Sequence, residues 1–89
     1  MITKTRYRTI GDEDYEVIIV DVQGEENVIG RVFKKFGQTE WRFKPFFKIG
    51  EKQRVLLFKG FYSFVEAGRI LTKLWEKSFF FNFFDEEQM

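Results

Sequence analysis

The spacing of apolar positions changes along this chain, and the change predicts strands followed by a helix. Residues 15–22 are rich in β-branched side chains, and apolar residues occupy both alternate sets of positions. That pattern predicts a strand covered on both faces. Residues 40–47 alternate instead, with aromatic residues and Pro45 on one parity and mostly charged residues on the other. This alternation predicts a half-buried strand. Pro45 has no backbone N–H to donate to a neighbouring strand, so it favours a sheet edge or a bulge.

Three further segments carry shorter extended patterns between polar or glycine-containing turns. These segments are residues 3–10, 28–36 and 54–59. Both parities of residues 28–36 are mixed, so the pattern leaves the inner face of that strand open. The sequence therefore predicts four or five strands joined by short turns.

A helix is the clearest local prediction. Ser63 and Glu66 fit a capping box, in which the serine caps a backbone N–H and the glutamate reaches back. Apolar side chains then recur at helical spacing and predict a helix over about residues 64–77. The predicted fold is α+β: an antiparallel β-meander of four to five strands with one C-terminal α-helix packed on a face, plus a short aromatic tail segment. Its 89 residues are predicted to form a single small domain, residues 1–89.

The aromatic tail segment is unusually rich in phenylalanine. Five of the 13 phenylalanines fall within residues 79–84, directly before three acidic residues. The segment could close the protein's own core, form the seam of a homodimer, or dock on a foreign protein, because so many clustered rings need to be covered. The partner-binding residues predicted on this basis are Phe79, Phe80, Phe81, Phe83 and Phe84.

Charge is distributed unevenly, although the formal net charge is only +1. Residues 1–30 carry three positive and seven negative side chains, and residues 31–59 carry nine positive and two negative. A basic strand pair could bind nucleic-acid phosphates, with Phe36 or Phe46 stacking on bases. The alternatives are an ordinary solvated sheet face, or acidic flanks that fold over the block and neutralise it. The nucleic-acid-binding candidates are Arg31, Lys34, Lys35, Arg42, Lys44 and Lys48.

A second basic pattern follows the predicted helix. Arg69, Lys73 and Lys77 recur at i, i+4 and i+8, which places them on one outer stripe. Cations on an exposed helix face usually serve only solvation. If the stripe lay on the same side as the basic block, the case for nucleic-acid binding would strengthen.

Catalysis and metal binding lack their usual side chains. The chain has no cysteine and no histidine, which removes the commonest general base, thiolate chemistry and the commonest transition-metal ligand. Its serines, Ser63 and Ser78, have no histidine to activate them, and its glycines form no phosphate-cradling loop. The acidic clusters at 12–14 and 85–87 do not match a calcium loop. We therefore expect no catalytic residues, no metal site, no cofactor and no enzymatic activity.

The sequence favours a small binding or regulatory protein that acts through protein–protein contacts, with self-association as a homodimer. No apolar run approaches the length of a membrane span, and the first residues lack a signal-peptide core, so a cytoplasmic protein without membrane contact is expected. In layout, a β-meander followed by a Phe-x-Ser-x-x-Glu-Ala helix resembles small accessory proteins of bacteria and their phages. The resemblance carries over no residue roles and no activity. An inhibitor or accessory factor would fit the predicted class of binding protein. The alternative is a nucleic-acid-binding protein with a basic aromatic sheet surface.

Overall fold

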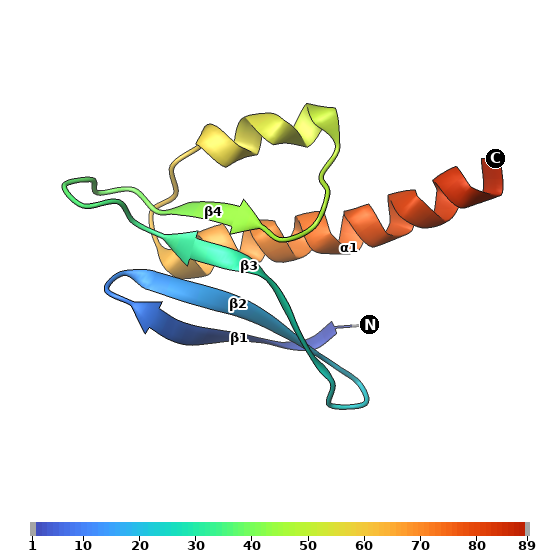
Figure 1. Cartoon of the computed structure of the whole chain (residues 1–89), viewed down its shortest axis with the longest axis horizontal. Helices are drawn as coiled ribbons and strands as arrows, with labels where there is room; N and C mark the ends of the chain where they lie inside the picture. The colour runs from blue at the N-terminus through green and yellow to red at the C-terminus, as the bar shows by residue number, and fades with distance from the viewer. Residues whose placement is uncertain (1, 89) are drawn as a thin grey trace.

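Four antiparallel strands form one sheet, and a long helix follows them in the chain (Figure 1). The computed structural model describes the backbone of residues 2–88 and the side chains of residues 4–77. The strands lie in the order β1-β2-β3-β4, so β1 and β4 are the edges. The elements are β1 (Ile2–Gly11), β2 (Asp14–Asp21), β3 (Glu26–Phe33), β4 (Arg42–Pro45), the 3₁₀ helix η1 (Glu51–Phe58) and α1 (Phe64–Gln88). The predicted α+β meander with one C-terminal helix is confirmed.

Strand β2 is covered on both faces, as its pattern predicts. Val17, Ile18 and Ile19 are consecutive and each is at most 1% exposed, so neither face of the strand meets solvent there. Val17 and Ile19 belong to the core beneath α1, whereas Ile18 lies outside that cluster. The prediction for Pro45 is also confirmed, because it ends the short edge strand β4.

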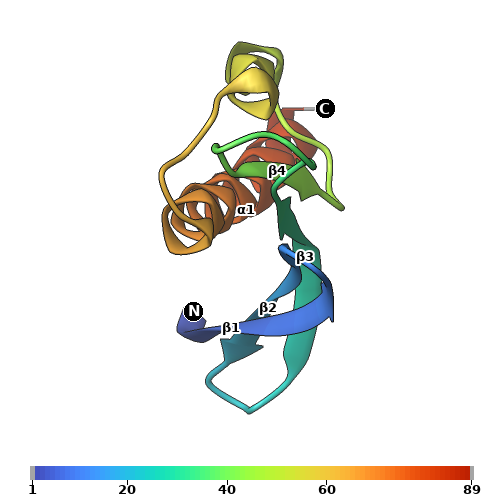
Figure 2. The same cartoon turned by 90° about the vertical axis from the view of Figure 1, so that its left-hand side faces the viewer.

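The predicted fifth strand is wrong. Residues 54–58 belong to η1, which packs beyond the free edge of β4, and Lys59 follows its end (Figure 2). Leu56 and Leu57 both pack against the core although they are adjacent, which one face of a strand could not achieve. The edge of β4 is extended instead by an isolated bridge, in which Trp41 and Phe61 exchange N–H···O bonds of 2.9 and 2.8 Å.

Helix α1 covers one face of the sheet (Figure 2). The buried side chains of Ala67, Leu71 and Leu74 lie in one cluster with Val32 and Phe43. The helix approaches closely because β3 carries a glycine. A Cβ on Gly30 would lie 2.8 Å from Leu71 Cδ2 and 2.5 Å from the Lys44 carbonyl oxygen.

The start of α1 confirms the predicted cap with one change. The Glu66 N–H donates to Ser63 Oγ at 3.2 Å, as a capping box requires. The Glu66 carboxylate accepts from the N–H of Tyr62, at 3.2 Å, rather than from that of Ser63. The helix continues past the predicted end at residue 77 to Gln88, so the backbone of residues 79–84 prolongs α1. The predicted roles of the five phenylalanine side chains lie outside the described residues.

Candidate binding surface

The two faces of the sheet differ in chemistry. The register aligns Tyr7, Val17 and Gly30 on the face that meets α1. On the opposite face, Arg8 pairs with Glu16, Glu16 with Arg31, and Arg31 with Lys44 across the four strands. The guanidinium of Arg8 donates from Nε to Glu16 Oε1 at 2.8 Å. This row on the outer face therefore holds three cations and one carboxylate, and the outer face is not uniformly basic.

Carboxylates in the β1–β2 turn and at the start of β2 neutralise two of the six predicted nucleic-acid-binding residues. Arg31 donates to both carboxylate oxygens of Asp14, at 3.1 and 2.5 Å. This hydrogen bonding raises the pKa of Arg31, so its positive charge is held in the pair. Lys34 Nζ lies 3.1 Å from the Glu13 carboxylate. The sequence leaves open whether the acidic flanks fold over the basic residues 31–59 and neutralise them. At Arg31 and Lys34 they do.

The other four predicted residues keep their charge available. Lys35, Lys44 and Lys48 are exposed, and Arg42 donates to the carbonyl oxygen of Phe58 at 2.6 Å. Within the part of the chain whose side chains are described, none of the four has an ion pair. Arg42 and Lys44 belong to β4, whereas Lys35 lies in the loop before it and Lys48 in the segment after it.

We name residues 35–62 the β4–η1 unit, because they contain β4, η1 and the loops around them. The unit has seven positive and two negative side chains, for a net charge of +5. Its exposed aromatic side chains include some of the most accessible large hydrophobic groups in the described structure. The exposed fractions are 105% for Phe36, 96% for Tyr62, 76% for Phe58 and 51% for Phe46.

Two segments of the β4–η1 unit are joined to each other by hydrogen bonds. The Trp41–Phe61 bridge joins the residue before β4 to the segment after η1, and the Arg42–Phe58 hydrogen bond joins the start of β4 to the end of η1. A cavity of about 440 Å³ lies between them, lined by Thr39, Glu40, Gly60, Phe61 and Tyr62. The Lys59 ammonium lies 5.6 Å from the centre of the Phe61 ring. The sequence alone points to Phe36 and Phe46, but it contains no signal for the exposure of Phe58 and Tyr62.

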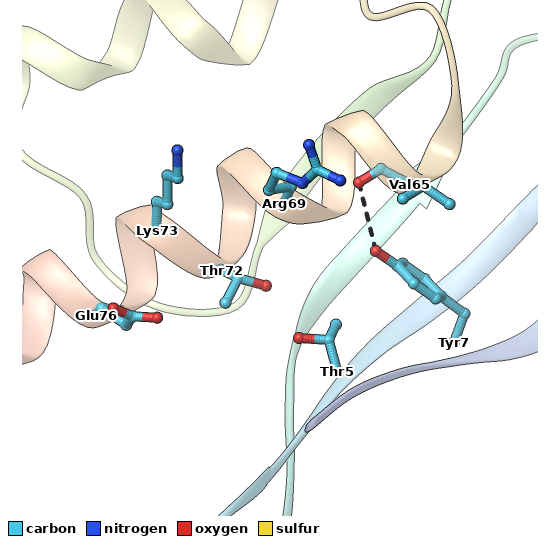
Figure 3. A pocket seen from close by; sticks show the side chains of 7 residues that line it. All are labelled: Thr5, Tyr7, Val65, Arg69, Thr72, Lys73 and Glu76. Carbon is cyan, nitrogen blue, oxygen red and sulfur yellow. Dashed lines mark hydrogen bonds between the residues drawn. The ribbon is translucent and has the colours of Figure 1, made fainter. Parts of the chain in front are cut away.

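A second cavity of about 380 Å³ lies between β1 and α1 (Figure 3). Its lining residues are Thr5, Tyr7, Val65, Arg69, Thr72, Lys73 and Glu76. Burial raises the pKa of Tyr7, and the nearby charge of Arg69 opposes this shift. Two members of the predicted helix stripe, Arg69 and Lys73, thus line this groove, whereas Lys77 is outside the lining.

Other site classes leave no trace in the described part of the chain. Among those residues, no three carboxylates gather in a way that could hold a metal ion. The helices described there include none with the length and apolar character needed to cross a membrane. Comparisons with protein-family models, curated proteins and solved structures give no match for this chain.

Proposed function

We propose that this protein is a small non-enzymatic binding protein that acts through protein–protein contact, with the β4–η1 unit as its contact surface. The observation that carries the proposal is the group of four exposed aromatic side chains among seven cations and two carboxylates. Aromatic anchors surrounded by a charged rim are typical of protein interfaces, and arginine and aromatic residues supply most hot spots. The absence of histidine and cysteine supports the non-enzymatic part of the proposal.

Charge complementarity favours a partner with an acidic surface. A net charge of +5 on one unit speeds the encounter with an acidic protein and disfavours basic ones. Phe58 and Tyr62 would then supply the apolar contacts, because they are exposed rings close in sequence to Phe61 of the Trp41–Phe61 bridge. An inhibitor or accessory factor of an acidic protein fits this arrangement.

The test uses the full chain and two surface variants. A partner captured by cross-linking is purified, and its affinity is measured by calorimetry. The double variant Phe58→Ala with Tyr62→Ala is expected to weaken binding by about tenfold or more, because truncated hot-spot rings typically cost at least 1–2 kcal/mol. Val22→Ala is the matched control, since Val22 is also well exposed, at 64%, but lies outside the β4–η1 unit. Equal affinities of both variants for every partner would refute the proposed surface.

Single-stranded nucleic acid is the second candidate ligand. Exposed rings interleaved with unpaired lysines are the combination that stacks on bases and neutralises phosphates. This candidate predicts that a short single-stranded oligonucleotide binds at low salt and loses affinity steeply between about 50 mM and about 200 mM salt. The double variant Lys44→Gln with Lys48→Gln should lower both the affinity and the salt dependence. Absent binding at low ionic strength would eliminate nucleic acid and leave the protein-contact proposal standing.

A further inference from the structure

The groove between β1 and α1 has two polar walls from different parts of the chain. Thr5 and Tyr7 come from β1, and Arg69 and Lys73 come from successive turns of α1 (Figure 3). Residues on successive turns of a helix share one face, so both cations border the same opening. The proposed contact surface on the β4–η1 unit contains none of these residues.

The donors in the groove are poorly satisfied within the protein. The Tyr7 hydroxyl donates to the Val65 carbonyl oxygen at 3.5 Å, which is long for an O–H···O bond. The side chains of Thr5, Arg69 and Lys73 have no hydrogen bond or ion pair with the residues that the structure describes. Thr72, by contrast, donates to the Gly68 carbonyl oxygen at 2.8 Å. Three donor side chains are therefore available to a ligand, and the Tyr7 hydroxyl would have to exchange its long bond to Val65 for one to the ligand.

We propose that this groove binds the phosphate group of a small phosphate ester, with Arg69 and Lys73 holding it from α1 and the hydroxyls of Thr5 and Tyr7 holding it from β1. Two cations and one carboxylate, that of Glu76, line the groove, so an anion is favoured over a cation. A tetrahedral phosphate accepts hydrogen bonds from several directions, which suits donors on two facing walls better than a flat carboxylate does. The lysine side chain is long and flexible, so its ammonium can turn into the opening.

The size of the groove favours an ester over free phosphate. Its volume of about 380 Å³ falls in the range of small-molecule sites. A bare phosphate would leave much of it empty, whereas an attached organic group could lie against Val65 and the aliphatic part of Lys73. The Arg69 guanidinium lies close enough to the Tyr7 phenol for its charge to oppose the rise in the pKa of Tyr7 that burial causes.

The experiment is a titration of the full chain with inorganic phosphate, O-phosphoserine and acetate, followed by amide NMR at constant ionic strength. Saturable shifts at residues 5–7 and 69–76 are expected with phosphate and, more strongly, with O-phosphoserine. Arg69→Gln and Lys73→Gln should each weaken binding by about tenfold, since each removes a charge-assisted contact. Lys77→Gln removes the same charge from the same helix stripe outside the groove, and it should change the affinity by less than about twofold.

Three outcomes would overturn this proposal. Shifts that do not saturate, or that are equally weakened in Arg69→Gln and Lys77→Gln, would indicate general ionic screening. Acetate binding as tightly as phosphate would indicate a carboxylate site. If the double variant Tyr7→Phe with Thr5→Val kept its affinity for phosphate, the hydroxyls of β1 would not contact the ligand. Because Phe58 and Tyr62 lie elsewhere, failure here leaves the test of the protein-contact surface unaffected. Circular dichroism of each variant confirms that it is folded.

Discussion

Tyr7 in β1 lies directly against the backbone of Gly68 in α1. A Cβ on residue 68 would come within 2.6 Å of Tyr7 Cε1 and 2.8 Å of Cζ, closer than real Cβ contacts occur. The Tyr7 ring is also held by Phe64, in an edge-to-face contact with ring centres 5.1 Å apart. Strand β1 and helix α1 therefore contact each other where the Tyr7 ring packs on Gly68, which has no side chain. This contact sets the width of the groove between β1 and α1.

Replacing Gly68 by alanine should destabilise the protein, although alanine is the better helix former. In an open helix position the change stabilises by about 1 kcal/mol. Here the new methyl group displaces Tyr7, and overpacking of this kind typically costs about 1–3 kcal/mol. We expect Gly68→Ala to lower the free energy of unfolding by about 1 kcal/mol in urea titrations followed by circular dichroism.

A double-mutant cycle separates the two effects. In a Tyr7→Ala background the ring is gone, so Gly68→Ala should regain its helix benefit of about 1 kcal/mol. The coupling between the two positions should then be about 1–2 kcal/mol. Additive effects within a few tenths of a kcal/mol would mean that the ring and the helix backbone are independent.

Alkaline pH should weaken the fold through the same phenol. Burial raises the pKa of Tyr7 above its ordinary value of 10.0, with a smaller opposing effect from Arg69. The folded state thus retains the phenolic proton at pH values where the unfolded chain has lost it. The protonated Tyr7 phenol therefore contributes its full stabilisation of the folded state below pH 10. This contribution is lost as the pH rises from 10 through the pKa that Tyr7 has in the folded state. Tyr7→Phe should flatten the pH dependence of the unfolding free energy above pH 10, and an unchanged slope would contradict this assignment.

The elements that the sequence predicts correctly are those with local causes. The capping box at Ser63 and the apolar spacing behind it determine where α1 begins, and both are properties of adjacent residues. Val17, Ile18 and Ile19 form a continuous apolar run, and such a run requires cover on both faces. Residues 54–59 fail as a predicted strand because their conformation depends on tertiary contacts, above all on two adjacent leucines that both reach the core.

The candidate surface was only partly predictable for a similar reason. Composition alone locates the positive charge within residues 31–59. Which cations are neutralised depends on the β2–β3 register, which brings Asp14 opposite Phe33 and beside Arg31. The exposure of Phe58 depends on η1, whose helical geometry its sequence pattern did not reveal.

Breaking the Asp14–Arg31 pair should cost measurable stability. The pair is bidentate and its side chains are only 24% and 33% exposed, so it is better shielded than a fully exposed ion pair. Asp14→Asn is expected to lower the unfolding free energy by about 1 kcal/mol. The Arg6–Glu26 pair is the matched comparison, because it crosses strands with both side chains more than 40% exposed. Glu26→Gln should cost less than about 0.5 kcal/mol, and an equal or larger loss would contradict the ranking.

Asp14→Asn also tests which surface carries the binding charge. The substitution frees Arg31 on the outer sheet face without altering the β4–η1 unit. If a basic sheet face bound nucleic acid, oligonucleotide affinity at low salt should rise by several-fold in this variant. Binding through the β4–η1 unit alone predicts a change of less than about twofold, measured by fluorescence polarisation.

Self-association stays a prediction for the phenylalanines of the tail, which are Phe79, Phe80, Phe81, Phe83 and Phe84. It can be tested by shortening the chain within α1. A chain ending at Ser78 retains Ala67, Leu71 and Leu74, the helix side chains in the buried core. It should therefore fold, as judged by circular dichroism. Sedimentation equilibrium is expected to detect a dimer of the full chain and a monomer of the shortened one, because a cluster of phenylalanine residues favours association when nothing else covers it. A chain ending at Phe84, which lacks only the acidic end, is the matched control and should remain dimeric. Two folded monomers would refute the dimer, and loss of folding in the shortened chain would instead assign these rings to the protein's own core.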